Sequence, residues 1–396
     1  MEPLAIRAFT LTSALGRGVG PALAALRAGR GGLRPCDFED VSLKTWIGRI
    51  DGLEEMPLNG AFADYDCRNN RLAALGLAQD GFAEAVAEAR VRHGAERIGV
   101  FIGTSTSGVL QAELAYRERD PESGELPAGF RYPHTLNAMS VTRFVRGRLG
   151  LGGPAMSMST ACSSSAKVFA TAYRHIALGN CDAAVVGGVD SLCLSTLYGF
   201  HSLGLVSTER CRPWDARRTG MSIGESAGFA LLERPAPGER GTPALLGYGE
   251  SSDAFHMSAP HPEGAGAAAA MRRALLSAGI GAHDIDYVNL HGTATPANDE
   301  TEDRAVVAVL GDATPCSSTK GWTGHTLGAA GIIEALFAML SVTEGFIPGT
   351  LNTSEPDARL SARIVLEGRD AEVRRALSNS FGFGGSNCSL VLGTLP

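Results

Sequence analysis

Residues 159–166, STACSSSA, place Cys162 between a strand-like and a helix-like stretch. The preceding residues 154–158 (PAMSM) alternate in a way typical of a strand, and residues 166–173 (AKVFATAY) are compatible with a helix. Unpaired N–H groups and the dipole at a helix N-terminus stabilise a thiolate, so this position predicts a nucleophilic Cys162 with a lowered pKa. A buried structural cysteine in a Ser-rich turn is the alternative, because free cysteines usually pack as small apolar residues.

Two histidines further along the chain offer partners for this cysteine. His291 ends a strand-like run in residues 287–296 (YVNLHGTATP), and His325 precedes an apolar helix in residues 318–331 (STKGWTGHTLGAAG). Each histidine taken alone could equally be a hydrogen-bonded structural residue in a Gly/Thr turn. Together with Cys162 they match a catalytic constellation whose members are separated in sequence and brought together by the fold.

The rest of the chain alternates strand-like and helix-like runs, which predicts an α/β fold. Residues 97–103 and 182–189 are expected to be buried strands. Residues 69–89 and 326–342 are expected to be helices, the first amphipathic and the second apolar. A Pro/Gly/Arg-rich stretch at 234–241 is the best candidate for an internal boundary.

Composition limits the kinds of partner. The chain has 396 residues, 44 % hydrophobic and 19 % charged, with a net charge of −7, so no general attraction to nucleic acid is expected. No signal-peptide pattern or 18-residue apolar run is found, and no membrane insertion is expected. The eight cysteines form no C-x-x-C pair, which argues against a zinc knuckle and favours reduced thiols in the cytoplasm.

Four motifs in order resemble the β-ketoacyl-acyl-carrier-protein synthases, which are condensing enzymes of the Cys-His-His type. The motifs are TACSS at 160–164, HGTAT at 291–295, KGWTGH at 320–325 and FGFGGSN at 381–387. The resemblance implies a thiolase-like α/β fold with five α-β-α-β-α layers and two pseudo-equivalent halves. We expect residues 1–240 to form the half with the nucleophile and residues 241–396 the half with both histidines.

The resemblance also implies the reaction. An acyl thioester held on Cys162 would condense with malonyl-acyl-carrier protein, with loss of CO₂, to give a 3-oxoacyl-acyl-carrier protein. The substrates would be carried on the phosphopantetheine of acyl carrier protein, and no cofactor and no metal are expected. The pathway would be fatty-acid or polyene/polyketide synthesis. Three stretches, residues 36–39, 45–49 and 320–322, resemble synthases of polyene-pigment clusters more than housekeeping fatty-acid enzymes.

Individual residues acquire roles by the same resemblance. His291 and His325 would donate to the malonyl thioester carbonyl, and the N–H groups of Cys162 and Phe383 would form an oxyanion hole. The other implied positions are Lys320 as electrostatic support with Glu334 as its counter-charge, Gly384 in the turn that carries Phe383, Thr293 and Thr295 for phosphopantetheine, Thr106 in the acyl pocket, and Arg68 and Arg71 for docking of the acidic carrier protein.

The strand before Cys162 would pair two copies into a homodimer, or would pair this chain with a related subunit in a heterodimer. A non-catalytic partner of the chain-length-factor type is one alternative function, although such partners usually lack the active cysteine. Another thiolase-fold enzyme is a second alternative, either a thiolase or an initiating condensing enzyme with Cys-His-Asn, and His325 argues against the latter. A metalloprotein using Cys162, His291 and His325 would lack the usual ligand spacing and an acidic fourth ligand.

Overall fold

One hydrogen-bonded sheet runs through the computed structural model, which describes all 396 residues, and it consists of two groups of strands. The N-terminal group contains, in spatial order, β6 (Ala155–Met158), β5 (Ile98–Gly103), β7 (Ala183–Asp190), β9 (Ser226–Glu233) and β1 (Leu4–Ser13). Strands β6, β5 and β7 are parallel, while β9 and β1 run antiparallel to their neighbours. Strands β5 and β7 are buried on both faces, as parallel strands usually are, while β6 at the edge is partly exposed.

The C-terminal group continues from β1 through a short antiparallel junction. Only Leu4 and Ala5 pair across it, with Leu245 and Ala244. The strands of this group are, in spatial order, β10 (Pro243–Ser252), β16 (Ser386–Thr394), β15 (Arg375–Gly382), β11 (Tyr287–Asn289) and β12 (Cys316–Ser317). In this long sheet, every strand before residue 234 therefore lies in the first group and every strand after residue 242 lies in the second. The division of the chain into two halves at residue 240 stays a prediction.

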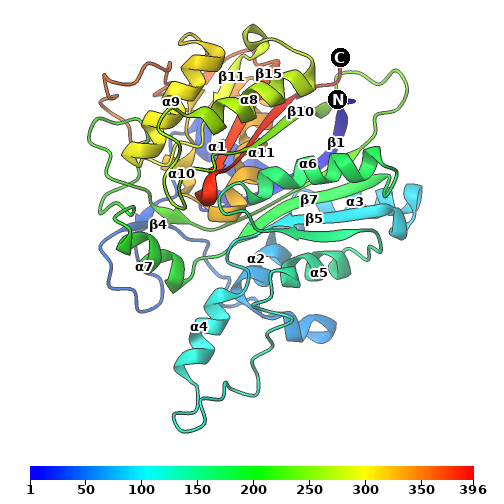
Figure 1. The fold of residues 1–396 in the computed structure, drawn as a ribbon. Coiled ribbons are helices and arrows are strands. Elements are labelled where there is room, and N and C mark those ends of the chain that lie inside the picture. Colours follow the sequence, from blue (N-terminus) through cyan, green and yellow to red (C-terminus); the bar gives the residue numbers. More distant parts are fainter.

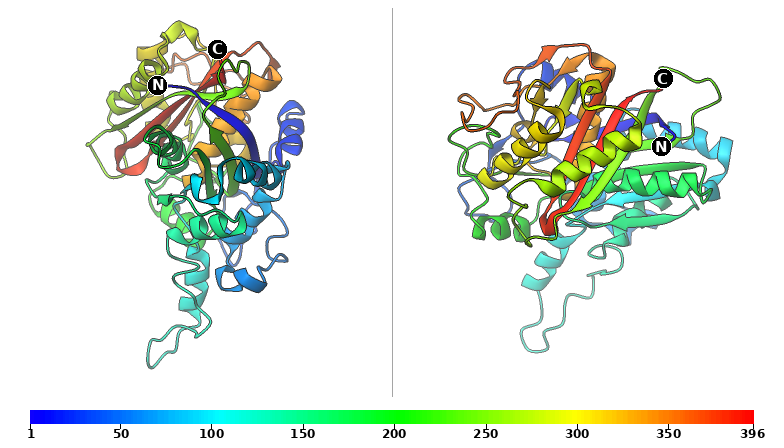
Figure 2. Two further views of the ribbon diagram at one scale, coloured as in Figure 1. Left: turned by 90° about the vertical axis from the view of Figure 1, so that its right-hand side faces the viewer. Right: turned by 45° about the horizontal axis from the view of Figure 1, so that its top comes forward.

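Two helices form the layer between the two groups (Figures 1 and 2). Helix α6 (Ser164–Ala177) and helix α11 (Ala330–Glu344) pack on each other and on strands of both groups. Helix α11 is apolar on nearly all sides, as expected for a helix enclosed by protein. The segment Leu327–Glu344 is long and apolar enough to cross a membrane by length and composition alone, but 83 % of it is buried inside the fold.

Outer helices cover the far face of each group, which completes the five-layer arrangement expected from the resemblance. The helices on the N-terminal group are α2 (Arg68–Leu77), α3 (Phe82–His93) and α5 (Met139–Arg148), and those on the C-terminal group are α8 (Ala265–Ala278) and α9 (Pro296–Leu310). The largest apolar cluster lies in the central layer and includes Phe169, Ile332 and Phe337.

Shorter elements surround these layers. They are α1 (Val19–Arg27), α4 (Val109–Arg117), α7 (Leu194–Ser202), α10 (Lys320–Thr323), β2 (Gly16–Arg17), β3 (Arg34–Pro35), β4 (Trp46–Gly48), β8 (Ile223–Gly224), β13 (Phe346–Ile347) and β14 (Arg369–Asp370). Helix α4 and the loop that follows it project away from the body of the molecule (Figure 1).

One predicted element is wrong in its extent. Residues 69–89 form two helices, α2 and α3, instead of one. The break falls at Asp80 and Gly81, both of which have positive φ values, 55° and 67°. The Asp80 carboxylate accepts hydrogen bonds from the hydroxyl of Thr10 (2.7 Å) and from the N–H of Val19, and these long-range contacts hold a backbone conformation that a helix cannot contain.

Candidate active site

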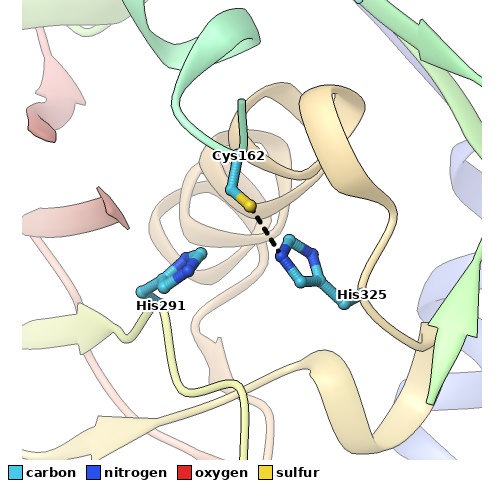
Figure 3. A group of neighbouring side chains, drawn as sticks. All are labelled: Cys162, His291 and His325. Atoms are coloured by element: carbon cyan, nitrogen blue, oxygen red, sulfur yellow. Dashed lines mark hydrogen bonds between the residues drawn. The ribbon is translucent and has the colours of Figure 1, made fainter. Parts of the chain in front are cut away.

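Cys162 lies at the turn between β6 and α6, as predicted, and its side chain is buried. The residue before it, Ala161, has a φ of 52°, a conformation that non-glycine residues adopt at a cost. This sharp turn directs the sulfur away from its own helix. The sulfur lies 3.0 Å from Nε2 of His325, and His291 lies beside both (Figure 3).

The predicted low pKa of Cys162 is wrong. Burial raises the pKa of this thiol to about 12, although the positive charge of Lys320 and the backbone N–H of Phe383 act in the opposite direction. Helix α6 begins two residues later, at Ser164, and its N-terminus does not outweigh the loss of water around the sulfur. The thiol therefore rests in its protonated form.

His325 follows the short helix α10 and is held on both sides by backbone hydrogen bonds. Its N–H donates to the carbonyl of Ser222 (2.7 Å), and its own carbonyl accepts from the N–H of Gly224 (3.0 Å). The ring atom Nδ1 accepts from the N–H of Leu327 (3.3 Å), which leaves Nε2 as the ring N–H that faces Cys162. Burial, followed by the charge of Lys320, lowers the pKa of His325 well below its usual value, so the ring is neutral.

His291 follows β11, and its ring is oriented by Lys320. The Lys320 ammonium lies 3.3 Å from Nδ1 of His291 and also donates to the His291 carbonyl oxygen. Because an ammonium group can only donate, Nδ1 must be the acceptor and Nε2 must carry the hydrogen. Burial, Lys320 and His325, in that order, lower the pKa of His291, so this ring is neutral as well.

Two buried carboxylates support this arrangement from behind. The carboxylate of Glu334 on α11 accepts a hydrogen bond from the Lys320 ammonium. Glu334 is therefore the counter-charge of Lys320, as the family resemblance implied. Glu302 on α9 accepts from the N–H groups of His291 and Gly292, both at 2.8 Å. Burial raises the pKa of both Glu302 and Glu334 to about 7, because the charged form loses its water.

A cavity of about 230 Å³ opens in front of the three reactive side chains. The hydroxyls of Thr293 and Thr295 lie 2.9 Å apart on its wall. Phe383 lines it too, with its ring 5.6 Å from that of Phe200, and its N–H points to the Cys162 sulfur. The adjacent Gly384 has a φ of 79°, which allows the tight turn that carries Phe383.

The predicted carrier-docking pair does not form an exposed patch. The Arg68 side chain is only 6 % exposed and pairs with Glu225 (2.6 Å) and Glu54 (2.5 Å). The carboxylate of Glu225 is fully buried and requires a cation, so it draws Arg68 into the protein. Arg71 remains partly exposed and pairs with Asp66 at 2.6 Å.

Thr106, predicted to line the acyl pocket, does not border the cavity at Cys162. It is buried in the loop after β5, where both its N–H and its hydroxyl donate to Asp190 at 2.8 Å. Neither Asp190 nor Glu302 was a candidate from the sequence. An acidic residue at the end of an apolar strand was the available signal for Asp190. Glu302 sits among three other acidic residues in one helix.

The sulfur of Cys162 and the ring nitrogens of His291 and His325 lie within 4.8 Å of one another, close enough to hold a metal ion. The Lys320 ammonium, 3.3 Å from His291, places a positive charge against that site. This arrangement opposes a cation and favours an anionic or polarised oxygen between the rings.

Comparisons with known proteins give a consistent result. Sequence models described as β-ketoacyl synthase, N-terminal and C-terminal domains, match residues 71–237 and 243–354. The chain is 40 % identical over 311 residues to a 3-oxoacyl-[acyl-carrier-protein] synthase 2 of Rhizobium meliloti (strain 1021), covering 74 % of this chain and 73 % of the relative.

Solved structures agree over nearly the full length. A ketosynthase (ApeO) in complex with its chain length factor (ApeC), from Xenorhabdus doucetiae, matches with a TM-score of 0.88 and 38 % identity, covering 99 % of this chain and 98 % of that one. The ishigamide ketosynthase/chain length factor also matches with a TM-score of 0.88, at 29 % identity, with 99 % of each chain covered.

Proposed function

Because this chain belongs to the β-ketoacyl synthase family and is a condensing 3-oxoacyl-acyl-carrier-protein synthase, we propose that Cys162, His291 and His325 carry its chemistry. The observation that supports this assignment is the cavity in which one sulfur and two neutral imidazoles meet. Nε2 of His325 lies 3.0 Å from the sulfur, and the two imidazole rings lie 5.4 Å apart and nearly perpendicular.

Acyl transfer is the first step. The Cys162 sulfur attacks the thioester carbonyl of the incoming acyl group, and the bond to the carrier's sulfur breaks. The N–H groups of Cys162 and Phe383 receive the charge that develops on the carbonyl oxygen. The Nε2–H of His325 stabilises the thiolate as its proton leaves, and that proton ends on the departing carrier thiol.

Decarboxylation of the malonyl group is the second step. Both Nε2–H groups would donate to the malonyl thioester oxygen and stabilise the enolate that remains when CO₂ leaves. The enolate carbon then attacks the acyl carbonyl, the bond to Cys162 breaks, and the thiolate takes up a proton again. Neutral rings suit this step, because each must present a hydrogen toward the developing oxyanion.

Lys320 acts as a positioning residue in this scheme. Its ammonium fixes Nδ1 of His291 as an acceptor, while Glu334 neutralises it in a region without water. Thr293 and Thr295 lie on the cavity wall, where their hydroxyls can bind the phosphopantetheine arm. No cofactor or metal takes part in either step.

The partners follow from the family and its complexes. We assign acyl carrier protein as the substrate carrier and place the enzyme in the cytoplasm. The relatives solved with a chain length factor support a pairing with a related subunit. The edge strand β6 is the surface on this chain that we assign to such a pairing or to pairing with a second copy. Cys162 makes this chain the catalytic member of such a pair, in a fatty-acid or polyene/polyketide pathway.

The direct test combines the protein with acyl- and malonyl-loaded carrier protein. Mass spectrometry should detect the acyl group on Cys162 and then a 3-oxoacyl product two carbons longer. Cys162→Ala should give neither species. Product formation by that variant, or release of CO₂ without any product from the wild type, would reject the assignment.

For docking, Arg131 replaces Arg68, because its side chain is half exposed in the loop between α4 and α5. Arg131→Glu should raise the KM for carrier-bound substrates and leave small thioester substrates unaffected, with the difference shrinking at high salt. Arg240→Glu, in an exposed turn, is the matched control. Equal KM values for both variants and the wild type would place docking elsewhere.

A further inference from the structure

Asp190 is a fully buried carboxylate at the end of β7, and the scheme above does not use it. Within the Thr104–Thr106 loop, five groups donate to it: the hydroxyls of Thr104, Ser105 and Thr106, and the N–H groups of Ser105 and Thr106, at 2.6 to 3.0 Å. A sixth donor, the N–H of Gly328, comes from the segment that follows His325, at 2.6 Å. No arginine, lysine or histidine pairs with it.

The contact with Gly328 is unusually close. A Cβ atom at this position would lie 2.7 Å from Oδ2 of Asp190 and 2.8 Å from the backbone nitrogen of Ser105. Only glycine therefore allows the backbone to approach the carboxylate this way. As a result, Asp190 fixes the Gly328 amide against the loop after β5.

This amide is next to the group that orients His325. The N–H of Leu327 donates to Nδ1 of His325, and Leu327 itself has a φ of 56°, in the left-handed region. A leucine in this conformation is strained and needs contacts that hold it. The hydrogen bond from Gly328 to Asp190 is such a contact, one residue away.

We propose that Asp190 is a positioning residue for malonyl decarboxylation, acting through the Leu327–Gly328 backbone on the tautomer and direction of the His325 ring. Without the carboxylate the buried Gly328 N–H would keep only its longer hydrogen bond to the Ser105 hydroxyl (3.2 Å), and that hydroxyl is itself held by Asp190, so the backbone would shift. The Leu327 N–H would then leave Nδ1, and Nε2 would no longer be fixed as the donor toward the cavity. This inference rests on the role given to His325 above.

Two substitutions disturb this contact from opposite sides. Asp190→Asn weakens the acceptor, and Gly328→Ala adds the Cβ that does not fit. Both should slow decarboxylation of malonyl carrier protein by about 10- to 100-fold, since small misplacement of a catalytic group costs rate on this scale. Acyl loading of Cys162 should fall less than decarboxylation, because the His325 hydrogen bond to the sulfur is only one of the groups that act in loading, and Phe383 and the turn at Ala161 are untouched.

Asp303→Asn is the matched control. Asp303 is another buried carboxylate that accepts backbone N–H groups, those of Ser361 and Ala362, but these lie outside the cavity. The Asp303→Asn substitution should lower the melting temperature without altering the ratio of the decarboxylation rate to the loading rate. A parallel fall of both half-reactions in Asp190→Asn and Gly328→Ala would reduce Asp190 to a structural role and overturn the proposal.

A spectroscopic readout separates this proposal from the assignment of His325 itself. The ¹⁵N shifts of the His325 ring should report Nε2–H in the wild type and in Asp303→Asn, and a mixture of tautomers in the other two variants. An unchanged tautomer in both variants would also overturn the proposal. If His325→Ala decarboxylates malonyl carrier protein at the normal rate, the proposed role of His325 fails. If His325→Ala is slow but the Asp190 and Gly328 variants decarboxylate at the normal rate, only the present inference fails.

Discussion

The surroundings of His291 and of His325 reach the same result by different physical means. Both rings are buried and neutral and carry their hydrogen on Nε2. At His291 the orienting donor is a charged side chain, Lys320, which needs its own buried counter-charge. At His325 the orienting donor is the neutral N–H of Leu327. A charged side chain gives a strong constraint that depends on its buried counter-charge, whereas a backbone N–H depends on loop geometry.

The largest effect should come from Cys162→Ala, because this variant lacks the sulfur that His325 and the Phe383 N–H face and that would carry the acyl group. Condensation and acyl loading should be lost completely. Decarboxylation of malonyl carrier protein should continue, since both Nε2–H donors remain. CO₂ release and intact-protein mass measure the two half-reactions separately, and loss of decarboxylation in this variant would mean that the histidines depend on the thiol.

His291→Ala and His325→Ala test the two sides directly. Each should reduce decarboxylation by about 10²–10³-fold, the usual cost of one oxyanion donor. Acyl loading should fall more for His325→Ala, which removes the hydrogen bond to the sulfur. Single-turnover loading, followed by mass spectrometry, distinguishes them. Equal loading rates in the two variants would mean that His325 has no greater role in acyl loading than His291.

Lys320→Met should affect only the His291 side. Decarboxylation should fall about 10- to 100-fold because the ring loses its fixed tautomer, while the ¹⁵N pattern of His325 stays unchanged. Glu334 is then left buried without a counter-charge, which costs about 3–5 kcal/mol of stability. Adding Glu334→Gln should restore most of the stability and none of the rate. If both the stability and the decarboxylation rate recover, the Lys320–Glu334 pair has only a structural role.

The smallest effect concerns pH. Burial raises the pKa of Glu302 from 4.5 to about 7 on the His291 side. Between these values the folded protein holds a proton that the unfolded chain releases, so this group's contribution to stability is lost as pH rises, by on the order of 1–3 kcal/mol. Urea unfolding of wild type and Glu302→Gln across this range should give a wild-type excess that declines with pH. A flat or rising difference would contradict it.

The sequence was sufficient for the features that depend on neighbouring residues. The turns around Cys162, His291 and His325 are marked by local Gly, Ala, Ser and Thr, and the strands before them by their apolar pattern. Features set by distant partners could not be read this way. Arg68 is buried because of Glu225, 157 residues later, and the helix break at Asp80 depends on Thr10.

The same limit explains the thiol and Asp190. The pKa of Cys162 is set mainly by enclosure, to which residues from both halves of the chain contribute, and no local motif reports how much water remains. Asp190 gains its importance from donors at 104–106 and at Gly328, on opposite sides of it in sequence. Such positions emerge only when the fold brings the segments together.

The enclosed, protonated state of Cys162 has a consequence for chemical labelling. Seven of the eight cysteines are buried, and Cys36 is the one that is partly open to solvent. Reagents that reach thiols by free diffusion will therefore modify Cys36 first and leave the reactive sulfur intact. A selective inhibitor of this enzyme therefore has to fit the cavity as a compact, uncharged electrophile. Its oxygen should lie between the two imidazoles, where both Nε2–H groups stabilise the negative charge that forms on it when the sulfur attacks.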